Sequence, residues 1–217
     1  MALAFFDLDN TLVAGDTAHA FSEYMAANAL PTPTDFLAVN QAHMEDYDNG
    51  VMDLDVYMRY TLSPLFDLNE TQIDAFIHQF IDDIIVSMTL PKANTLLKKH
   101  HDAGDEVVII SATGIHLVAP IARYLGVKHA LGIDIEIKEG HITGELIGIP
   151  TFREGKVIRA EQWAKENGFP IEGSYFYSDS HNDLPLLEKV QYPIAVDPDS
   201  VLEKTAKSNG WPIISLR

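Results

Sequence analysis

Two aspartates near the start of the chain, Asp7 and Asp9, come directly after the short apolar run Leu3–Phe6. Such a run predicts a buried strand, so both carboxylates are expected at its tip. A carboxylate held there can attack an electrophile such as phosphorus in line. A second carboxylate two residues later can exchange a proton with the departing group. The alternative is that both aspartates only cap the helix that follows.

A second pair of aspartates, Asp179 and Asp183, follows another predicted strand in the segment 177–183. Carboxylates are hard oxygen ligands of the kind that Mg²⁺ prefers. The pattern is therefore consistent with Mg²⁺ bound by Asp7, Asp179 and the carbonyl of Asp9, with Asp183 holding a water molecule on the ion. Taken in isolation, this acidic segment is better explained as a solvated loop.

Two further features have the chemistry to stabilise a phosphate group. Ser111 and Ala112 follow the apolar run Val107–Ile110, and a hydroxyl with free backbone N–H groups at a strand-to-helix turn suits phosphate oxygens. Lys156 starts a predicted helix, where an ammonium can offset charge that builds up during phosphoryl transfer. Each feature alone is better explained as a capping turn or a solvated lysine, so their assignment depends on the whole set.

The elements that would position these residues alternate between strands and helices after Pro91. This alternation predicts an α/β fold with a doubly wound, Rossmann-like parallel sheet. Ligands of such sheets bind beyond the carboxyl ends of the strands, so the motifs are expected to meet at one edge. The predicted strands are residues 3–6, 106–110, 175–177, 192–196 and 211–216, with a hairpin over 133–149.

Residues 17–86 show apolar positions at helical spacing, and prolines separate the individual helices. This stretch is too long for one crossover connection, so it predicts a small helical cap inserted into the sheet domain. The expected boundaries are 1–15 and 88–217 for the α/β core, and 16–87 for the cap. A capping box is predicted at Asn69 and Gln72.

The composition excludes several classes of function. The net charge of −17 argues against nucleic-acid and membrane binding, and a small phosphate ester would need a local positive site. The chain has no cysteine, which excludes disulfides, thiolate catalysis and cysteine zinc sites. No apolar run is long enough to cross a bilayer and no basic signal region is present, so a cytoplasmic location is expected. The expected oligomeric state is a monomer or a homodimer.

Together, the four motifs resemble those of the haloacid dehalogenase superfamily of phosphatases, over nearly the whole chain. The second aspartate, Asp9, favours phosphate-ester hydrolysis, because members that cleave carbon–halogen bonds lack it. The resemblance implies that Asp7 is the nucleophile and that Asp9 is the acid/base. It implies that phosphate or substrate is contacted by Ser111, Ala112, Lys156 and Asn182. The magnesium site that it implies consists of Asp7, Asp9, Asp179 and Asp183.

The helical insertion resembles the cap of the phosphoserine phosphatase-like branch, and the chain is similar to hydrolases labelled histidinol-phosphatase or phosphoserine phosphatase. In that branch a glutamate and an arginine hold the substrate's amino and carboxylate groups, which implies such roles for Asp16 and Arg59. Asp16 is one methylene shorter than that glutamate, and Arg59 is equally well explained as a surface arginine paired with an acid.

The function that follows is a Mg²⁺-dependent phosphomonoesterase acting on a small phosphorylated metabolite through an aspartyl-phosphate. A phosphotransferase or mutase would use the same chemistry and is the first alternative. The second is a non-catalytic module that binds a phosphorylated ligand.

Overall fold

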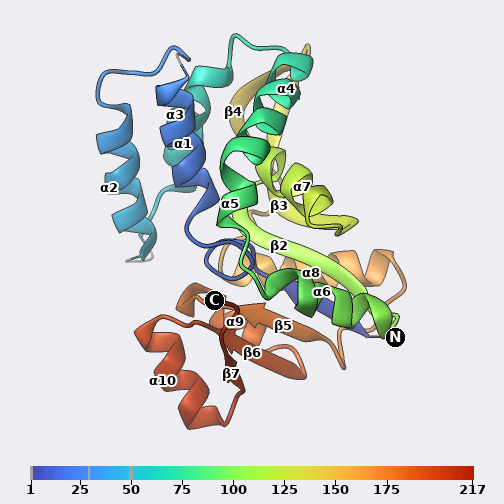
Figure 1. Cartoon of the computed structure of the whole chain (residues 1–217). Coiled ribbons are helices and arrows are strands. Elements are labelled where there is room, and N and C mark those ends of the chain that lie inside the picture. The colour runs from blue at the N-terminus through green and yellow to red at the C-terminus, as the bar shows by residue number, and fades with distance from the viewer. Residues whose placement is uncertain (1, 29, 49–50) are drawn as a thin grey trace.

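A seven-stranded sheet forms the centre of the protein (Figure 1). The structure, a computed structural model, describes residues 2–28, 30–48 and 51–217. The strand order is β4-β3-β2-β1-β5-β6-β7, and neighbouring strands run parallel except in the β3–β4 hairpin. The strands are β1 Leu3–Phe6, β2 Glu106–Gly114, β3 His129–Lys138, β4 His141–Ile147, β5 Tyr175–Ser178, β6 Tyr192–Val196 and β7 Ile213–Ile214. The predicted doubly wound α/β fold is confirmed, with the predicted hairpin providing an antiparallel edge strand.

Helices cover both faces of the sheet, which explains why β1 is apolar at every position. On one face of the sheet, Phe5 packs with side chains of three helices. On the other face, Phe6 packs with side chains of two further helices and of the helices between β1 and β2. The first set is α8 (Glu154–Glu166), α9 (Leu184–Leu187) and α10 (Ser200–Asn209); the second is α6 (Ala93–Asp102) and α7 (Ile115–Tyr124). Both faces of β1 are thereby excluded from water.

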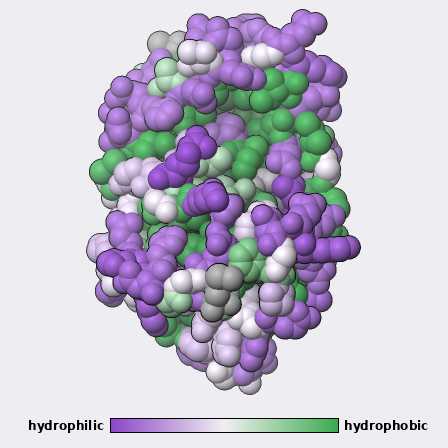
Figure 2. All heavy atoms as spheres, turned by 90° about the vertical axis from the view of Figure 1, so that its right-hand side faces the viewer, coloured by the Kyte–Doolittle hydropathy of each residue, from purple (hydrophilic) through white to green (hydrophobic). Residues whose placement is uncertain are grey.

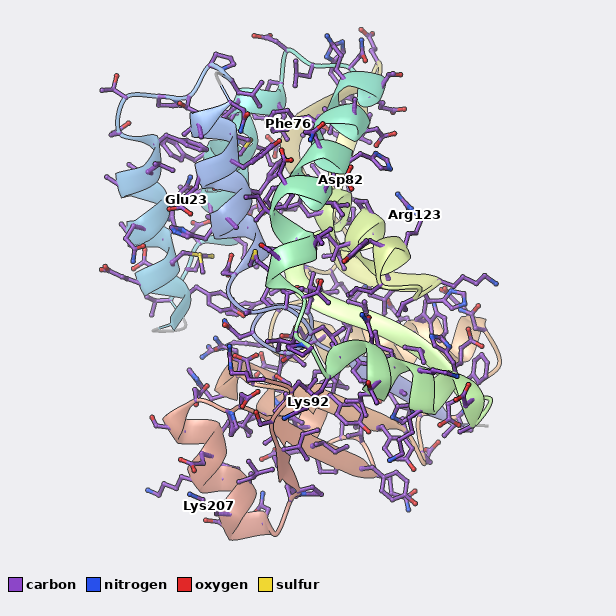
Figure 3. All side chains as sticks on the ribbon, viewed as in Figure 1. Glu23, Phe76, Asp82, Lys92, Arg123 and Lys207 are labelled. Atoms are coloured by element: carbon purple, nitrogen blue, oxygen red, sulfur yellow. The ribbon has the colours of Figure 1, made fainter. Side chains whose placement is uncertain are left out.

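Further helices lie between β1 and β2, at the top of Figure 1. They are α1 Thr17–Ala27, α2 Phe36–Asp48, α3 Leu54–Leu62, α4 Glu70–Phe80 and α5 Val86–Met88, with a 3-10 turn at Ser63–Leu65 and a π-helical turn at Ile81–Ile85. We call residues 16–88 the helical segment. Figure 3 shows Phe76 of α4 beside α1, where its ring centroid lies 5.8 Å from that of Phe21. The predicted capping box at Asn69 and Gln72 is confirmed.

The helical segment enters and leaves the sheet at one place. The Ala14 N–H donates to the Met88 carbonyl at 2.7 Å, and the Leu90 N–H donates to the Leu12 carbonyl at 3.0 Å. A second attachment is the hairpin, because a Cβ built on Gly144 of β4 would lie only 3.1 Å from the Cα of Arg59 on α3. The division into two domains at residues 15/16 and 87/88 stays a prediction.

Two stretches of backbone near the carboxyl edge differ from the prediction. Strand β2 continues through Ser111 to Gly114, where the sequence predicted a turn. Its pairing with β3 shifts register between Ile110 and Gly114, so this part of the strand is irregular and its polar groups are available for other contacts. The predicted strand 211–216 is reduced to β7, because Pro212 before it has no N–H to donate and the Leu216 N–H after it donates to the Asp197 side chain.

The face shown in Figure 2 is mainly hydrophilic. Apolar residues appear there as separate areas among polar ones. Within the described residues, no helix combines the length and the apolar character required to cross a membrane.

His116 on α7 is a buried titratable group in the core. Neither of its ring nitrogens has a hydrogen-bond partner among the described residues, and burial lowers the pKa of the imidazole to about 4. An unfolded histidine has a pKa near 6.5. As the pH falls, His116 therefore binds a proton in the unfolded chain at a higher pH than in the folded chain. This lowers the free energy of unfolding progressively between about pH 6.5 and 4.

We expect His116→Leu to remove that pH dependence. Between pH 7.5 and 5 the free energy of unfolding should fall by about 2 kcal/mol more in the wild type than in the variant. The reason is that the unfolded wild type binds a proton at His116, whereas leucine binds none. Urea unfolding of both proteins at both pH values measures this. Equal losses in the two proteins would show that His116 is not a buried neutral group.

Candidate active site

Strand β1 brings Asp7 to the carboxyl edge of the sheet. Phe6 pairs with Ile109 of β2 and with Tyr177 of β5, and the Asp7 N–H donates to the Tyr177 carbonyl at 2.9 Å. Because the three strands are parallel, the residues that follow them lie at one edge. Asp179, two residues beyond Tyr177, is therefore brought to the same edge as Asp7.

A cavity of about 540 Å³ lies at this edge, against the helical segment. Six of the predicted site residues line it, namely Asp7, Asp9, Asp16, Ser111, Ala112 and Asp179. The helical segment contributes a mixed apolar and polar wall, which includes His19, Gln41, Met44, Tyr47, Met52, Leu54 and Tyr57. The loop after β5 and the start of α10 complete it with Ser180, His181, Asp199, Ser200 and Val201. As the sequence predicted, the carboxylates of Asp7 and Asp179 share one cavity.

Lys156 is buried behind Asp7 and does not line the cavity. Its Nζ lies 2.8 Å from Asp7 Oδ1 and 2.7 Å from Asp183 Oδ1, and its side chain is only 2% exposed. Burial alone would lower the pKa of Lys156, but the carboxylates of Asp183 and Asp7 raise it above its ordinary value. The ammonium is therefore charged. Asp183 also accepts from the Ser178 hydroxyl at 2.7 Å, so it belongs to this buried network.

The carboxylates of Asp7 and Asp179 repel one another and their acidic neighbours. Burial raises the pKa of Asp7 well above its usual range; Lys156 opposes this, while Asp183, Asp179 and Asp9 add to it. Burial and then Asp183 raise the pKa of Asp179 to about 7, against the effect of a hydrogen bond from the Thr11 hydroxyl at 3.1 Å. The site has more carboxyl groups than its one buried ammonium can offset when all of them are ionised, and the raised pKa values reflect this imbalance together with burial.

Asp9 connects the sheet edge to the helical segment. Its Oδ1 accepts from the backbone N–H of Thr17, the first residue of α1, at 2.6 Å. Its Oδ2 accepts from the hydroxyls of Ser111 at 3.1 Å and Thr113 at 2.9 Å. This network holds the Asp9 side chain at the cavity wall, where it can reach a group bound beside Asp7.

Three other predicted residues have different surroundings. Asp16 lines the cavity as the N-cap of α1, with Oδ1 accepting from the His19 N–H at 2.7 Å. Asn182 is buried; its Oδ1 accepts from Arg153 Nε at 3.1 Å, and its Nδ2 donates to the Tyr47 carbonyl at 3.4 Å. Arg59 is not brought to the cavity. Its side chain is 59% exposed and pairs with Glu145 of β4, which is the surface ion pair that the sequence left open as an alternative.

Hydroxyl groups that the sequence did not single out hold the acidic side chains in place. Thr11 binds Asp179, Thr113 binds Asp9 and Ser178 binds Asp183. Each stands within a stretch already marked by a motif, and for Thr11 and Ser178 a hydroxyl beside a motif aspartate was the available signal. The tyrosines of the helical segment carried no such signal, because their place at the cavity depends on tertiary packing.

The donor set suits a hard divalent cation. Among the described residues, no three His, Cys, Asp or Glu side chains form a ready-made metal cage. Mg²⁺ does not need one, because it is commonly held by one or two carboxylates and several waters. Asp7 and Asp179 supply two carboxylates on the wall of a cavity large enough for water and a ligand.

Comparison with known proteins agrees with this chemistry. The profile of the haloacid dehalogenase-like hydrolase family matches residues 4–188. The chain belongs to this family. Over 219 residues it is 37% identical to a histidinol-phosphatase of Neisseria meningitidis, covering 99% of both chains. It is 34% identical to the phosphoserine phosphatase SerB1 of Mycobacterium tuberculosis, covering 100% of this chain and 71% of that one. The predicted family and the prediction of a phosphatase are confirmed.

A solved structure shows the same fold. It is a protein of unknown function from Bordetella pertussis Tohama I, with a TM-score of 0.92 and 36% sequence identity. The alignment covers 100% of this chain and 99% of that chain. The α/β architecture of this hydrolase is therefore shared over its full described length.

Gly155 sets the position of Lys156 at the start of α8. A Cβ on Gly155 would lie 1.9 Å from the backbone oxygen of Pro150, so any side chain forces the backbone apart. We expect Gly155→Ala to lower the unfolding free energy by about 2–3 kcal/mol, as overpacking does. Urea unfolding measures this against Glu154→Ala, an exposed neighbour that should have little effect. Equal midpoints for the two variants would show that the contact at Gly155 does not constrain α8.

Proposed function

We propose that this hydrolase is a Mg²⁺-dependent phosphomonoesterase that cleaves a small phosphorylated metabolite through an aspartyl-phosphate on Asp7. The observation that carries the proposal is the placement of Asp7. Its carboxylate lines the cavity beside Asp179, while a buried ammonium, Lys156, lies 2.8 Å behind its Oδ1. A carboxylate held in this way is oriented before substrate arrives, which reduces the ordering cost of in-line attack.

The proposed reaction has two steps. In the first, a carboxylate oxygen of Asp7 forms a bond to phosphorus while the bond from phosphorus to the ester oxygen breaks, and Asp9 gives that oxygen a proton. In the second, a water molecule attacks the phosphorus, Asp9 takes its proton, and the bond to Asp7 breaks. The second step restores both side chains and releases inorganic phosphate.

The other site residues would stabilise charge during these steps. Ser111 and the backbone at Ala112 line the cavity; backbone N–H groups there can donate to phosphate oxygens, and the Ser111 hydroxyl would do so by turning away from Asp9. Lys156 offsets negative charge on Asp7 from behind. Asp7, Asp179 and the Asp9 carbonyl would hold Mg²⁺, which supplies a Lewis acid for the phosphoryl oxygens when it is bound.

The proposed substrates are small esters of the phosphoserine or histidinol phosphate type. A cavity of about 540 Å³ fits molecules of this size. The names of the Neisseria and Mycobacterium relatives support both types, so family membership alone does not choose between them.

We expect Asp7→Asn to lower phosphate release by at least about a thousandfold, because an amide is not a nucleophile here. Asp9→Asn should slow turnover by about a hundredfold or more, since it removes the acid/base group. Release of inorganic phosphate from p-nitrophenyl phosphate, with Mg²⁺ and again after chelation, measures both effects. Asp102→Asn, on the exposed end of α6, is the matched control and should match the wild type.

Wild-type activity in Asp7→Asn would rule out the aspartyl-phosphate. Full activity in the chelated enzyme would rule out the role given to Mg²⁺ while leaving the nucleophile in place. With an excess of a second alcohol, formation of a new phosphate ester in place of free phosphate would identify a phosphotransferase.

A further inference from the structure

The cavity walls carry acidic groups but no lysine or arginine. Its lining includes the carboxylates of Asp7, Asp9, Asp16, Asp179 and Asp199, and no Lys or Arg side chain lines it within the described residues. The helical segment explains this absence, because Arg59 is its single basic residue of either type. In Figure 3 the labelled cations Lys92, Arg123 and Lys207 lie outside that segment, while the labelled Glu23 and Asp82 lie within it.

Arg59 is directed away from the cavity by the geometry of α3. Tyr57 lines the cavity. An α-helix turns by about 100° per residue, so Arg59, two positions later, lies about 200° further round the helix axis and on the other side of α3. The guanidinium of Arg59 accordingly pairs with Glu145 on β4. The close packing of Gly144 against the Arg59 backbone fixes this part of α3 on the hairpin.

Two basic side chains on the sheet side, Lys156 and Arg153, are already engaged. Lys156 is buried between Asp7 and Asp183. Arg153 donates from Nε to Asn182, and its guanidinium lies 5.5 Å from the centroid of the Phe152 ring. Neither side chain lines the cavity. A substrate carboxylate would therefore enter an acidic cavity without a fixed cation to receive it.

The wall that the helical segment contributes suits a positively charged group. Asp16 supplies a carboxylate, and Tyr47 and Tyr57 supply aromatic rings, which attract ammonium groups. Burial raises the pKa of both tyrosines, so their phenols are neutral. His19 lines the same wall, and its buried Nδ1 has no hydrogen-bond partner among the described residues.

We infer that the preferred substrate is a phosphomonoester whose alcohol part carries a cationic amine and no carboxylate. Asp16, Tyr47 and Tyr57 face the ammonium, and the acidic wall disfavours an additional negative charge. This inference rests on the proposed phosphomonoesterase function and narrows its substrate class to amino-alcohol phosphates, with amino-acid phosphates disfavoured.

The test compares two esters that differ only in one carboxylate. O-phosphoethanolamine and O-phospho-L-serine have the same ammonium and phosphate, and we expect kcat/KM to be at least tenfold higher for phosphoethanolamine. Assays are run at pH 8, above the range in which histidines usually carry charge. p-Nitrophenyl phosphate, which has neither group, reports the basic phosphatase activity.

Two variants test the reason for the preference. Met44→Arg places a cation on the cavity wall and should raise the phosphoserine to phosphoethanolamine ratio of kcat/KM at least fivefold, because it provides the missing partner for the carboxylate. Arg59→Ala should leave the ratio and the activity toward p-nitrophenyl phosphate within twofold of wild type, since Arg59 is held outside the cavity by Glu145.

Equal or faster hydrolysis of phosphoserine by an enzyme active on p-nitrophenyl phosphate would overturn the inference and leave the proposed function standing. A selective loss of phosphoserine hydrolysis in Arg59→Ala would also overturn it, because the arginine would then reach the substrate. Inactivity toward all three esters would overturn the proposed function and this inference together.

Discussion

The buried ammonium of Lys156 between Asp7 and Asp183 is the interaction on which the site depends. All three groups are withdrawn from water, and a buried charge is stable only with close partners. The triad joins the tip of β1, the first turn of α8 and the short turn after β5. Loss of the Lys156 ammonium would leave two buried carboxylates without their shared counter-charge, and breaking a buried ion pair in this way typically costs about 3–5 kcal/mol. The geometry that orients Asp7 is therefore also a condition of folding.

One ammonium does not balance the acidic groups at this edge. Asp179 and Asp9 lie on the cavity side, where hydroxyls of Thr11, Ser111 and Thr113 donate to them. Neutral donors orient these carboxylates without cancelling their charge. In the proposed reaction this excess would attract a divalent cation and a substrate ammonium, and the phosphate would be held through the cation and the backbone.

Local patterns in the sequence predicted the sheet edge, because a strand and the residue after it are consecutive in the chain. Asp7 and Asp179 could thus be placed together from Leu3–Phe6 and 175–177 alone. The outward direction of Arg59 could not be predicted, since it depends on which side of α3 faces the cavity and on the packing of Gly144. Helix α10 was missed, although Asp199 as an N-cap and Gly210 after the last turn were readable signals.

The hydrogen bond from the Thr17 N–H to Asp9 links the two halves of the cavity. The proposed phosphate end is built from strand tips, whereas the wall proposed to face the amine comes from a segment attached at one chain crossing and along the hairpin. Because Thr17 is the first residue of α1, any displacement of α1 from the sheet edge removes a donor from Asp9. Movement of the wall proposed to contact the alcohol part would thereby change the orientation of Asp9, the proposed acid/base. In that proposal, binding energy from the amine would favour the arrangement that protonates the leaving oxygen.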